Sequence, residues 1–64
     1  MNPESENIMT RAWSTIRKVA STAGFAARQT TCDGRTCYLL LDQSNNVRLC
    51  TRSGAELEAA VYSL

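Results

Sequence analysis

Apolar residues in the first third of the chain recur at three- and four-residue spacing, which places them on one side of a helix. Asn2 is a strong N-cap residue, Pro3 suits a first helical turn, and Gly24 suits a helix end. The pattern therefore predicts a helix over about residues 2–23. Its buried stripe comprises Ile8, Ala12, Ile16, Val19, Ala20 and Ala23, with Trp13 at one edge.

The Asp33-Gly34 pair predicts a β-hairpin. It lies between two runs that can both be extended, residues 25–32 and 35–42. A two-residue Asp-Gly loop favours a type I′ turn, because both positions need positive φ and the turn's twist matches that of the paired strands. With this loop, Arg28 faces Leu39 across the hairpin.

A second hairpin is expected at residues 43–46, which are turn formers, and residues 47–51 alternate as a third strand. Matching this alternation to the second strand places Leu39 and Leu41 with Val47 and Leu49, on the face that we expect the helices to cover. The opposite, open face is then expected to carry Gln29, Tyr38, Leu40, Arg48, Cys50 and Arg52.

The last segment reads as a second helix. Ser53 and Glu56 have the spacing of a capping box, and apolar residues recur from Leu57 to the chain end. We therefore predict one α+β domain over residues 1–64, in the order α-β-β-β-α. It is a three-stranded antiparallel meander with the N- and C-terminal helices on one face. Its core is expected to join Leu39, Leu41, Val47 and Leu49 to Ile8, Ile16, Val19 and Leu57.

The chain's composition limits its function. A domain of 64 residues buries only about 60% of the surface its unfolded chain exposes, so a second subunit is a common source of added stability. The densest apolar stretch, residues 39–41, is far shorter than the roughly 20 residues of a membrane span. The N-terminus is acidic where a secretory signal is basic. We expect a cytoplasmic protein, in the host cytoplasm if it is phage encoded, without membrane contact.

Catalytic residue types are sparse. Histidine is absent, which removes the commonest general acid–base, the usual nucleophile pairs and a frequent zinc ligand. Each carboxylate falls at a helix start, a turn or a strand end, and the three glycines leave no phosphate-binding loop. We therefore expect no enzyme activity, no cofactor and no small-molecule substrate.

The three cysteines are Cys32, Cys37 and Cys50, which we interpret as small half-buried hydrophobic residues. A structural zinc site needs four ligands, and the chain offers no fourth Cys or His. Asp33 could complete the set, but the tight turn needs it for backbone reasons, so we expect no metal. Cys32 and Cys37 are diagonal neighbours on one face of the hairpin. A disulfide between them is geometrically possible, although the cytosol would keep it reduced.

The net charge of +1 conceals an uneven distribution. All seven basic residues lie between positions 11 and 52, where the only acids are Asp33 and Asp42, so this stretch carries 7 − 2 = 5 positive charges. Such a stretch is either the footprint of an anionic partner or an ordinary pair of solvated faces.

The helix that ends in Ala23-Gly24-Phe25, followed by Arg28-Gln29 and a hairpin, resembles the double-stranded-RNA-binding fold. It also resembles the small HicA-type toxins, which share the α-β-β-β-α order. The resemblance covers about residues 16–50. The toxins' activity rests on a histidine in the second strand, where this chain has Thr36 and Cys37. The resemblance therefore implies a topology without ribonuclease activity.

Two hypotheses follow. The first is a non-enzymatic regulator or inhibitor, of a kind often encoded by phages and mobile elements, that binds a protein or a second copy of itself through the open sheet face or an edge strand. The second is an RNA- or DNA-binding protein that stacks bases on an aromatic side chain of a basic sheet face. The predicted contact residues are Tyr38, Leu40, Arg28, Arg35, Arg48 and Arg52.

Overall fold

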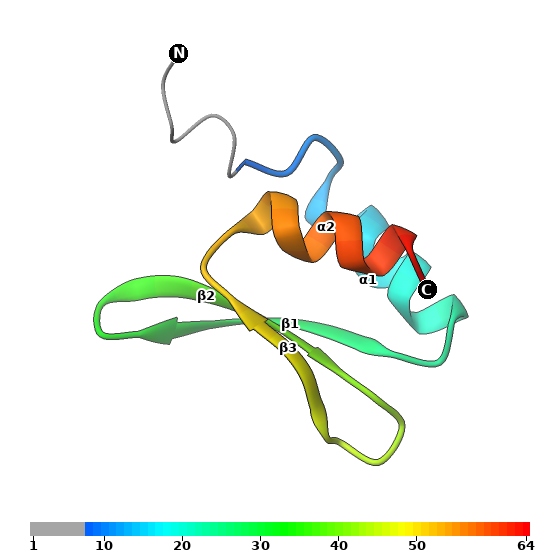
Figure 1. Ribbon diagram of the computed structural model, residues 1–64. Coiled ribbons are helices and arrows are strands. Elements are labelled where there is room, and N and C mark those ends of the chain that lie inside the picture. Colours follow the sequence, from blue (N-terminus) through cyan, green and yellow to red (C-terminus); the bar gives the residue numbers. More distant parts are fainter. Residues whose placement is uncertain (1–7) are drawn as a thin grey trace.

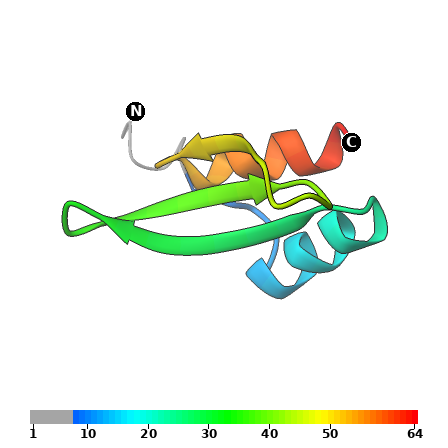
Figure 2. The same ribbon diagram turned by 90° about the horizontal axis from the view of Figure 1, so that it is seen from below.

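The computed structural model describes residues 8–64. Its elements follow the order α1 (Trp13–Thr22), β1 (Ala26–Cys32), β2 (Arg35–Leu41), β3 (Val47–Thr51) and α2 (Gly54–Tyr62). The three strands form one antiparallel sheet in the order β1-β2-β3, so β1 and β3 are its edges. Both helices lie on the same side of this sheet (Figure 1), and Figure 2 shows the strands in front of the helices when the molecule is seen from below. The predicted α-β-β-β-α meander is confirmed.

The hairpin between β1 and β2 has the predicted turn and register. Asp33 and Gly34 adopt φ values of 52° and 76°, as a type I′ turn requires. Arg28 lies opposite Leu39, and the seven pairs of this ladder run without interruption. The end of the hairpin that carries the turn projects beyond both helices (Figure 1).

The pairing of β2 with β3 differs from the prediction. Leu40 lies opposite Leu49, whereas Leu41 lies opposite Val47. Arg48 is therefore an extra residue on β3, and the ladder contains a β-bulge at this point. Simple alternation along the sequence does not reveal such an insertion.

The changed pairing reverses which side chains of β2 the helices cover, because successive residues of a strand point to opposite faces. Leu40 is only 3% exposed and belongs to the core. Tyr38 faces α1, where its ring centroid lies 5.5 Å from that of Trp13. The prediction that Tyr38 and Leu40 lie on the open face is therefore wrong. Leu39 and Leu41 alternate with them and lie on the open face instead.

The core forms between the two helices and the covered face of the sheet. Leu49, Val19 and Phe25 pack against its margin. Ile8 and Val47 were expected in this core but are 62% and 54% exposed, so that part of the prediction is wrong. The buried residues that make up the core are Ile16, Ala20, Ala27, Leu40, Leu57 and Val61.

The first helix begins later than the sequence predicts. Ala12 has extended backbone angles, with φ −61° and ψ 143°, and residues 8–12 contain no helix. The backbone N–H groups of Thr10 and Arg11 bond to a side chain of α2, described below, rather than within a helix. The predicted start at residues 2 and 3 lies outside the described residues.

The second helix has the predicted N-cap, Ser53, but the reciprocal half of the capping box is replaced, because the Ser53 N–H donates to the Thr51 hydroxyl at 3.0 Å. The Ser53 hydroxyl accepts a hydrogen bond of 3.1 Å from the backbone N–H of Glu56, which caps α2. Over residues 8–64, neither helix is long and apolar enough to cross a membrane.

Candidate functional site

A groove of about 620 Å³ runs between α1 and the edge strand β1. This volume falls within the usual range for ligand-binding pockets. Four consecutive residues of β1, 26–29, line one wall. The other wall is a single face of α1, because its lining residues are spaced four apart. Those helix residues are Trp13, Arg17 and Ser21, with Lys18 beside them and Phe25 following the helix.

The outer edge of β1 offers unpaired backbone groups beside this groove. In a type I′ turn the C=O of Cys32 accepts a hydrogen bond from the N–H of Arg35, so these two residues form a hydrogen-bonded pair. Along an antiparallel ladder, hydrogen-bonded pairs alternate with pairs whose backbone groups point away from each other. The alternation directs the N–H and C=O groups of Ala27, Gln29 and Thr31 away from β2. Within residues 8–64, these groups make no backbone hydrogen bond to a turn, a loop or a helix. Such an edge is a template for another strand.

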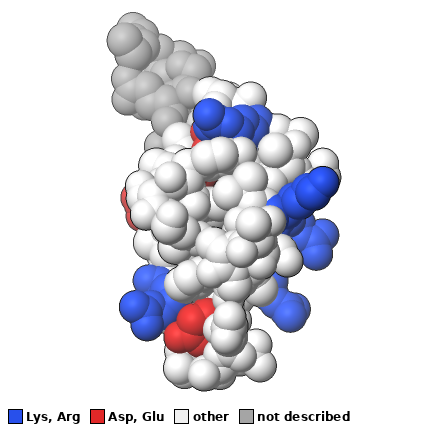
Figure 3. All heavy atoms as spheres, turned by 90° about the vertical axis from the view of Figure 1, so that its right-hand side faces the viewer, with Lys and Arg blue, Asp and Glu red and all other residues white. Residues whose placement is uncertain are grey.

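The groove is positively charged. Arg17 and Lys18 extend from the helix and Arg28 from the strand, and none of the three has an acidic partner within ion-pair distance in the described part of the chain. In the view of Figure 3, Lys and Arg side chains follow the right-hand side of the molecule, with no Asp or Glu among them. Three of the four other arginines are ion-paired: Arg11 with Glu58 at 3.5 Å, Arg48 with Asp42 at 3.6 Å and Arg52 with Asp33 at 3.8 Å.

The aromatic residues of the groove contribute apolar surface. Trp13 and Phe25 are both half-buried and pack against the core. Tyr38, which we expected to stack nucleic-acid bases on the open face, lies under α1 against Trp13. The groove therefore combines apolar aromatic surface with positive charge.

The six predicted contact residues do not form one surface. Tyr38 and Leu40 lie under the helices, and of the six only Arg28 lines the groove. The other three lie apart from it: Arg35 beside the turn, Arg48 in the bulge and Arg52 after β3.

Sequence reasoning missed the helical wall of the groove. Trp13 was expected at the edge of the buried stripe. The basic residues between positions 11 and 52, which include Arg17 and Lys18, were expected to be either the footprint of an anionic partner or part of ordinary solvated faces. The spacing of Trp13, Arg17 and Ser21 was visible in the sequence and indicates one helix face. Nothing local indicated that this face would flank an edge strand.

The three cysteines lie on the open face as free thiols. Cys37 is buried, Cys32 is half-buried and Cys50 is exposed. Hydrogen bonding with the Cys37 side chain is the main cause that raises the pKa of the Cys32 thiol. Among residues 8–64, no group of three or more Cys, His, Asp or Glu side chains is arranged to hold a metal ion.

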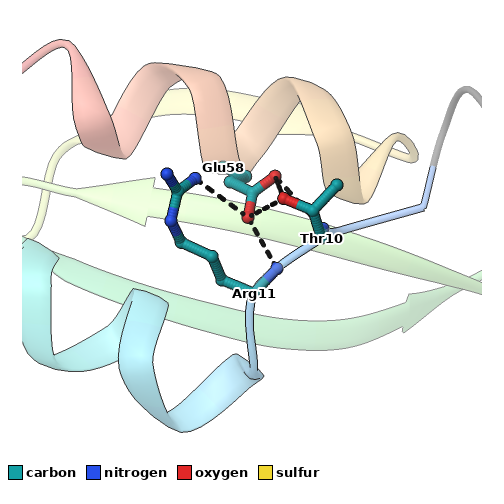
Figure 4. A network of polar contacts seen from close by, with 3 residues as sticks. All are labelled: Thr10, Arg11 and Glu58. Atoms are coloured by element: carbon teal, nitrogen blue, oxygen red, sulfur yellow. Dashed lines mark hydrogen bonds and ion pairs between the residues drawn. The ribbon is translucent and has the colours of Figure 1, made fainter.

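A buried carboxylate lies away from the groove, on α2. Glu58 is 7% exposed and accepts hydrogen bonds from the N–H of Thr10 at 3.2 Å, the hydroxyl of Thr10 at 3.0 Å and the N–H of Arg11 at 2.8 Å (Figure 4). Burial alone would raise the pKa of Glu58, but these hydrogen bonds and the Arg11 charge outweigh it and lower the pKa. The arrangement joins the segment before α1 to α2, which is a structural role.

Comparison with known protein families, with curated proteins and with solved structures found no match to this chain. The resemblance to the double-stranded-RNA-binding fold and the HicA-type toxins thus consists of element order alone. Any functional assignment has to come from the groove and the edge strand.

Proposed function

We propose that this chain is a protein-binding module that accepts an extended segment of a partner protein as a fourth strand on β1. The observation that carries the proposal is the outer edge of β1, which no strand among residues 8–64 pairs with and which lies directly beside a groove. In strand addition, backbone hydrogen bonds supply affinity and the surroundings of alternate side chains supply specificity. Here the edge of β1 supplies the backbone hydrogen bonds, and α1 supplies the surroundings of the side chains that point toward it.

The alternation of β1 defines how the segment binds. Ala27 and Gln29 lie within the groove and direct their N–H and C=O groups outward, so the added strand pairs with them. Partner side chains opposite these two residues point toward α1. The partner side chain between them points to the open face, beside Arg28.

Binding of this kind suits a small non-enzymatic regulator or inhibitor, which acts by occupying an extended segment of its target. Most of the residues between 8 and 64 lie at the surface, which supports the proposal. We assign the activity to the cytoplasm, where reducing conditions preserve free thiols such as those of Cys32, Cys37 and Cys50.

Selection of binders from a random-peptide display library tests the proposal, with the wild-type protein and two variants of Gln29. Gln29→Pro removes an outward N–H without removing a ladder hydrogen bond, which an edge strand tolerates. Gln29→Ala keeps the N–H and is the matched control. We expect selected peptides to bind the wild type and Gln29→Ala equally, and Gln29→Pro at least about tenfold more weakly.

A peptide-side version of the experiment needs no protein variant. Only every second N–H group of the bound peptide faces β1. Methylation of that set of backbone nitrogens is expected to abolish binding, and methylation of the other set is expected to leave binding intact. Failure to select any peptide, or binding that is indifferent to both Gln29→Pro and methylation, would contradict strand addition.

A further inference from the structure

We infer that the segment taken up by β1 is acidic, with two adjacent carboxylate side chains followed or preceded by an apolar one. This inference rests on the proposed function and adds the chemistry of the partner. It draws on the placement of three cations and two aromatic rings around the groove.

The cations stand on both sides of the path of an added strand. Arg17 and Lys18 belong to the helix wall, whereas Arg28 alternates with Ala27 and Gln29 and extends on the open side. Neighbouring residues of the added strand point to opposite sides, so two successive carboxylates each meet a positive charge. Within residues 8–64 no acid of this chain neutralises these three cations.

The position of the apolar residue follows from the direction of α1. The helix leads into β1 through a short turn at Gly24 and runs back alongside the strand. The Trp13 ring lies 5.5 Å from that of Tyr38, which pairs with Gln29, so the Trp13 end of α1 lies toward Gln29. A partner side chain opposite Gln29 therefore meets Trp13, and one opposite Ala27 meets the basic part of the helix.

A peptide explains this surface better than a nucleic acid does. Single-stranded nucleic acids bind through successive aromatic platforms within a long basic track. Trp13 and Phe25 are instead half-buried against the core, and Tyr38 packs against Trp13. The alternating outward N–H and C=O groups of Ala27 and Gln29 match a peptide backbone. Phosphate oxygens can accept from the N–H groups but cannot donate to the C=O groups.

The experiment compares three fluorescent peptides of seven residues, built from threonine and valine, with two central glutamates, two central glutamines or two central lysines. Fluorescence anisotropy gives their affinities for the full chain at low and at high salt. We expect the glutamate peptide to bind about tenfold more tightly than the glutamine peptide at low salt, and the difference to shrink at high salt. The lysine peptide is expected to bind most weakly.

Protein variants then locate the charges. Arg28→Gln and Arg17→Gln are each expected to reduce the preference for glutamate over glutamine about threefold, because they weaken binding of the glutamate peptide more than binding of the glutamine peptide. Arg35→Gln is the matched control, because it removes the same charge from an exposed position beside the turn, outside the groove. We expect it to leave the preference unchanged.

Three results would overturn the inference, and they are distinguishable. Equal affinity for the glutamate and glutamine peptides would leave strand addition intact and refute the acidic partner. Binding of none of the three peptides would count against strand addition itself. Binding of a short oligothymidylate more tightly than the glutamate peptide, weakened by Arg17→Gln and Arg28→Gln, would assign the groove to nucleic acid.

Discussion

The carboxylate of Glu58 accepts a hydrogen bond of 2.8 Å from the backbone N–H of Arg11, a residue 47 positions earlier in the chain. The Arg11 guanidinium lies 3.5 Å from the same carboxylate, and it also stands 4.0 Å above the centre of the Tyr62 ring. This contact holds the segment before α1 against α2. It is one of the contacts that fix α1, and with it the helical wall of the groove.

The lowered pKa of Glu58 makes this contact sensitive to acid. The unfolded chain binds the proton more tightly than the folded one, so the stabilisation is fully present above the ordinary pKa of about 4.5 and is lost as the pH falls through the folded value. We expect Glu58→Gln to lower the melting temperature at neutral pH and to flatten its dependence on pH below about 5. Thermal unfolding followed by circular dichroism across this range measures both effects.

Glu56→Gln is the matched control, since Glu56 is exposed on the same helix and makes none of these contacts. It is expected to change the melting temperature less and to retain the wild-type acid dependence. Identical behaviour of the two variants would show that Glu58 does not hold the segment.

The orientation of β2 is tested by two neighbouring leucines. Leu40 is 3% exposed in the core, so Leu40→Ala is expected to lower the free energy of unfolding by about 2–5 kcal/mol. Leu39 is only half-buried, on the open face, and its alanine variant is expected to cost about 1 kcal/mol. Urea denaturation compares the two, and a larger loss for Leu39→Ala would mean that the sheet is turned the other way.

The turn at Gly34 isolates a backbone effect. Gly34 has φ 76°, and a Cβ added there would meet no atom within 4 Å. We expect Gly34→Ala to cost about 1–2 kcal/mol through its backbone conformation alone. Gly34→Asn is expected to cost less, because Asn tolerates the left-handed region. Equal losses in urea denaturation of the two variants would contradict a type I′ turn.

The three thiols are expected to react in the order of their exposure. Cys50 is exposed and should be alkylated fastest by iodoacetamide, whereas Cys37 is 3% exposed and should react slowest. Cys32 should fall between them, and its rate should rise most steeply at alkaline pH because its pKa is raised. Mass spectrometry of partly alkylated protein gives the order, and early modification of Cys37 would contradict the sheet register.

Local chemistry in the sequence was enough to predict several elements. The positive φ values required by Asp33-Gly34 define the hairpin wherever it occurs, and the Ser53 side chain caps α2 through a residue only three positions away. Signals of this kind act over a few residues and depend little on the rest of the fold.

The errors concern features that depend on distant residues. Leu39, Leu40 and Leu41 are all apolar, so β2 carries no alternation there to indicate its covered face. The prediction took the face from the alternation of β3, and the bulge at Arg48 shifts that pairing by one residue. The start of α1 depends on the hydrogen bond from the Arg11 N–H to Glu58, which is 47 residues away in the sequence. The groove likewise depends on where α1 comes to lie beside β1, which no local pattern encodes.

Amide hydrogen exchange of β1, measured with and without the glutamate peptide, tests strand addition most directly. In the free protein the outward N–H of Gln29 is expected to exchange quickly and the ladder-bonded N–H of Arg28 slowly. Saturating peptide is expected to protect Gln29 strongly and to leave Arg28 little changed. A Gln29 amide that is already protected in the free protein, or that stays unprotected when the peptide is bound, would contradict the account.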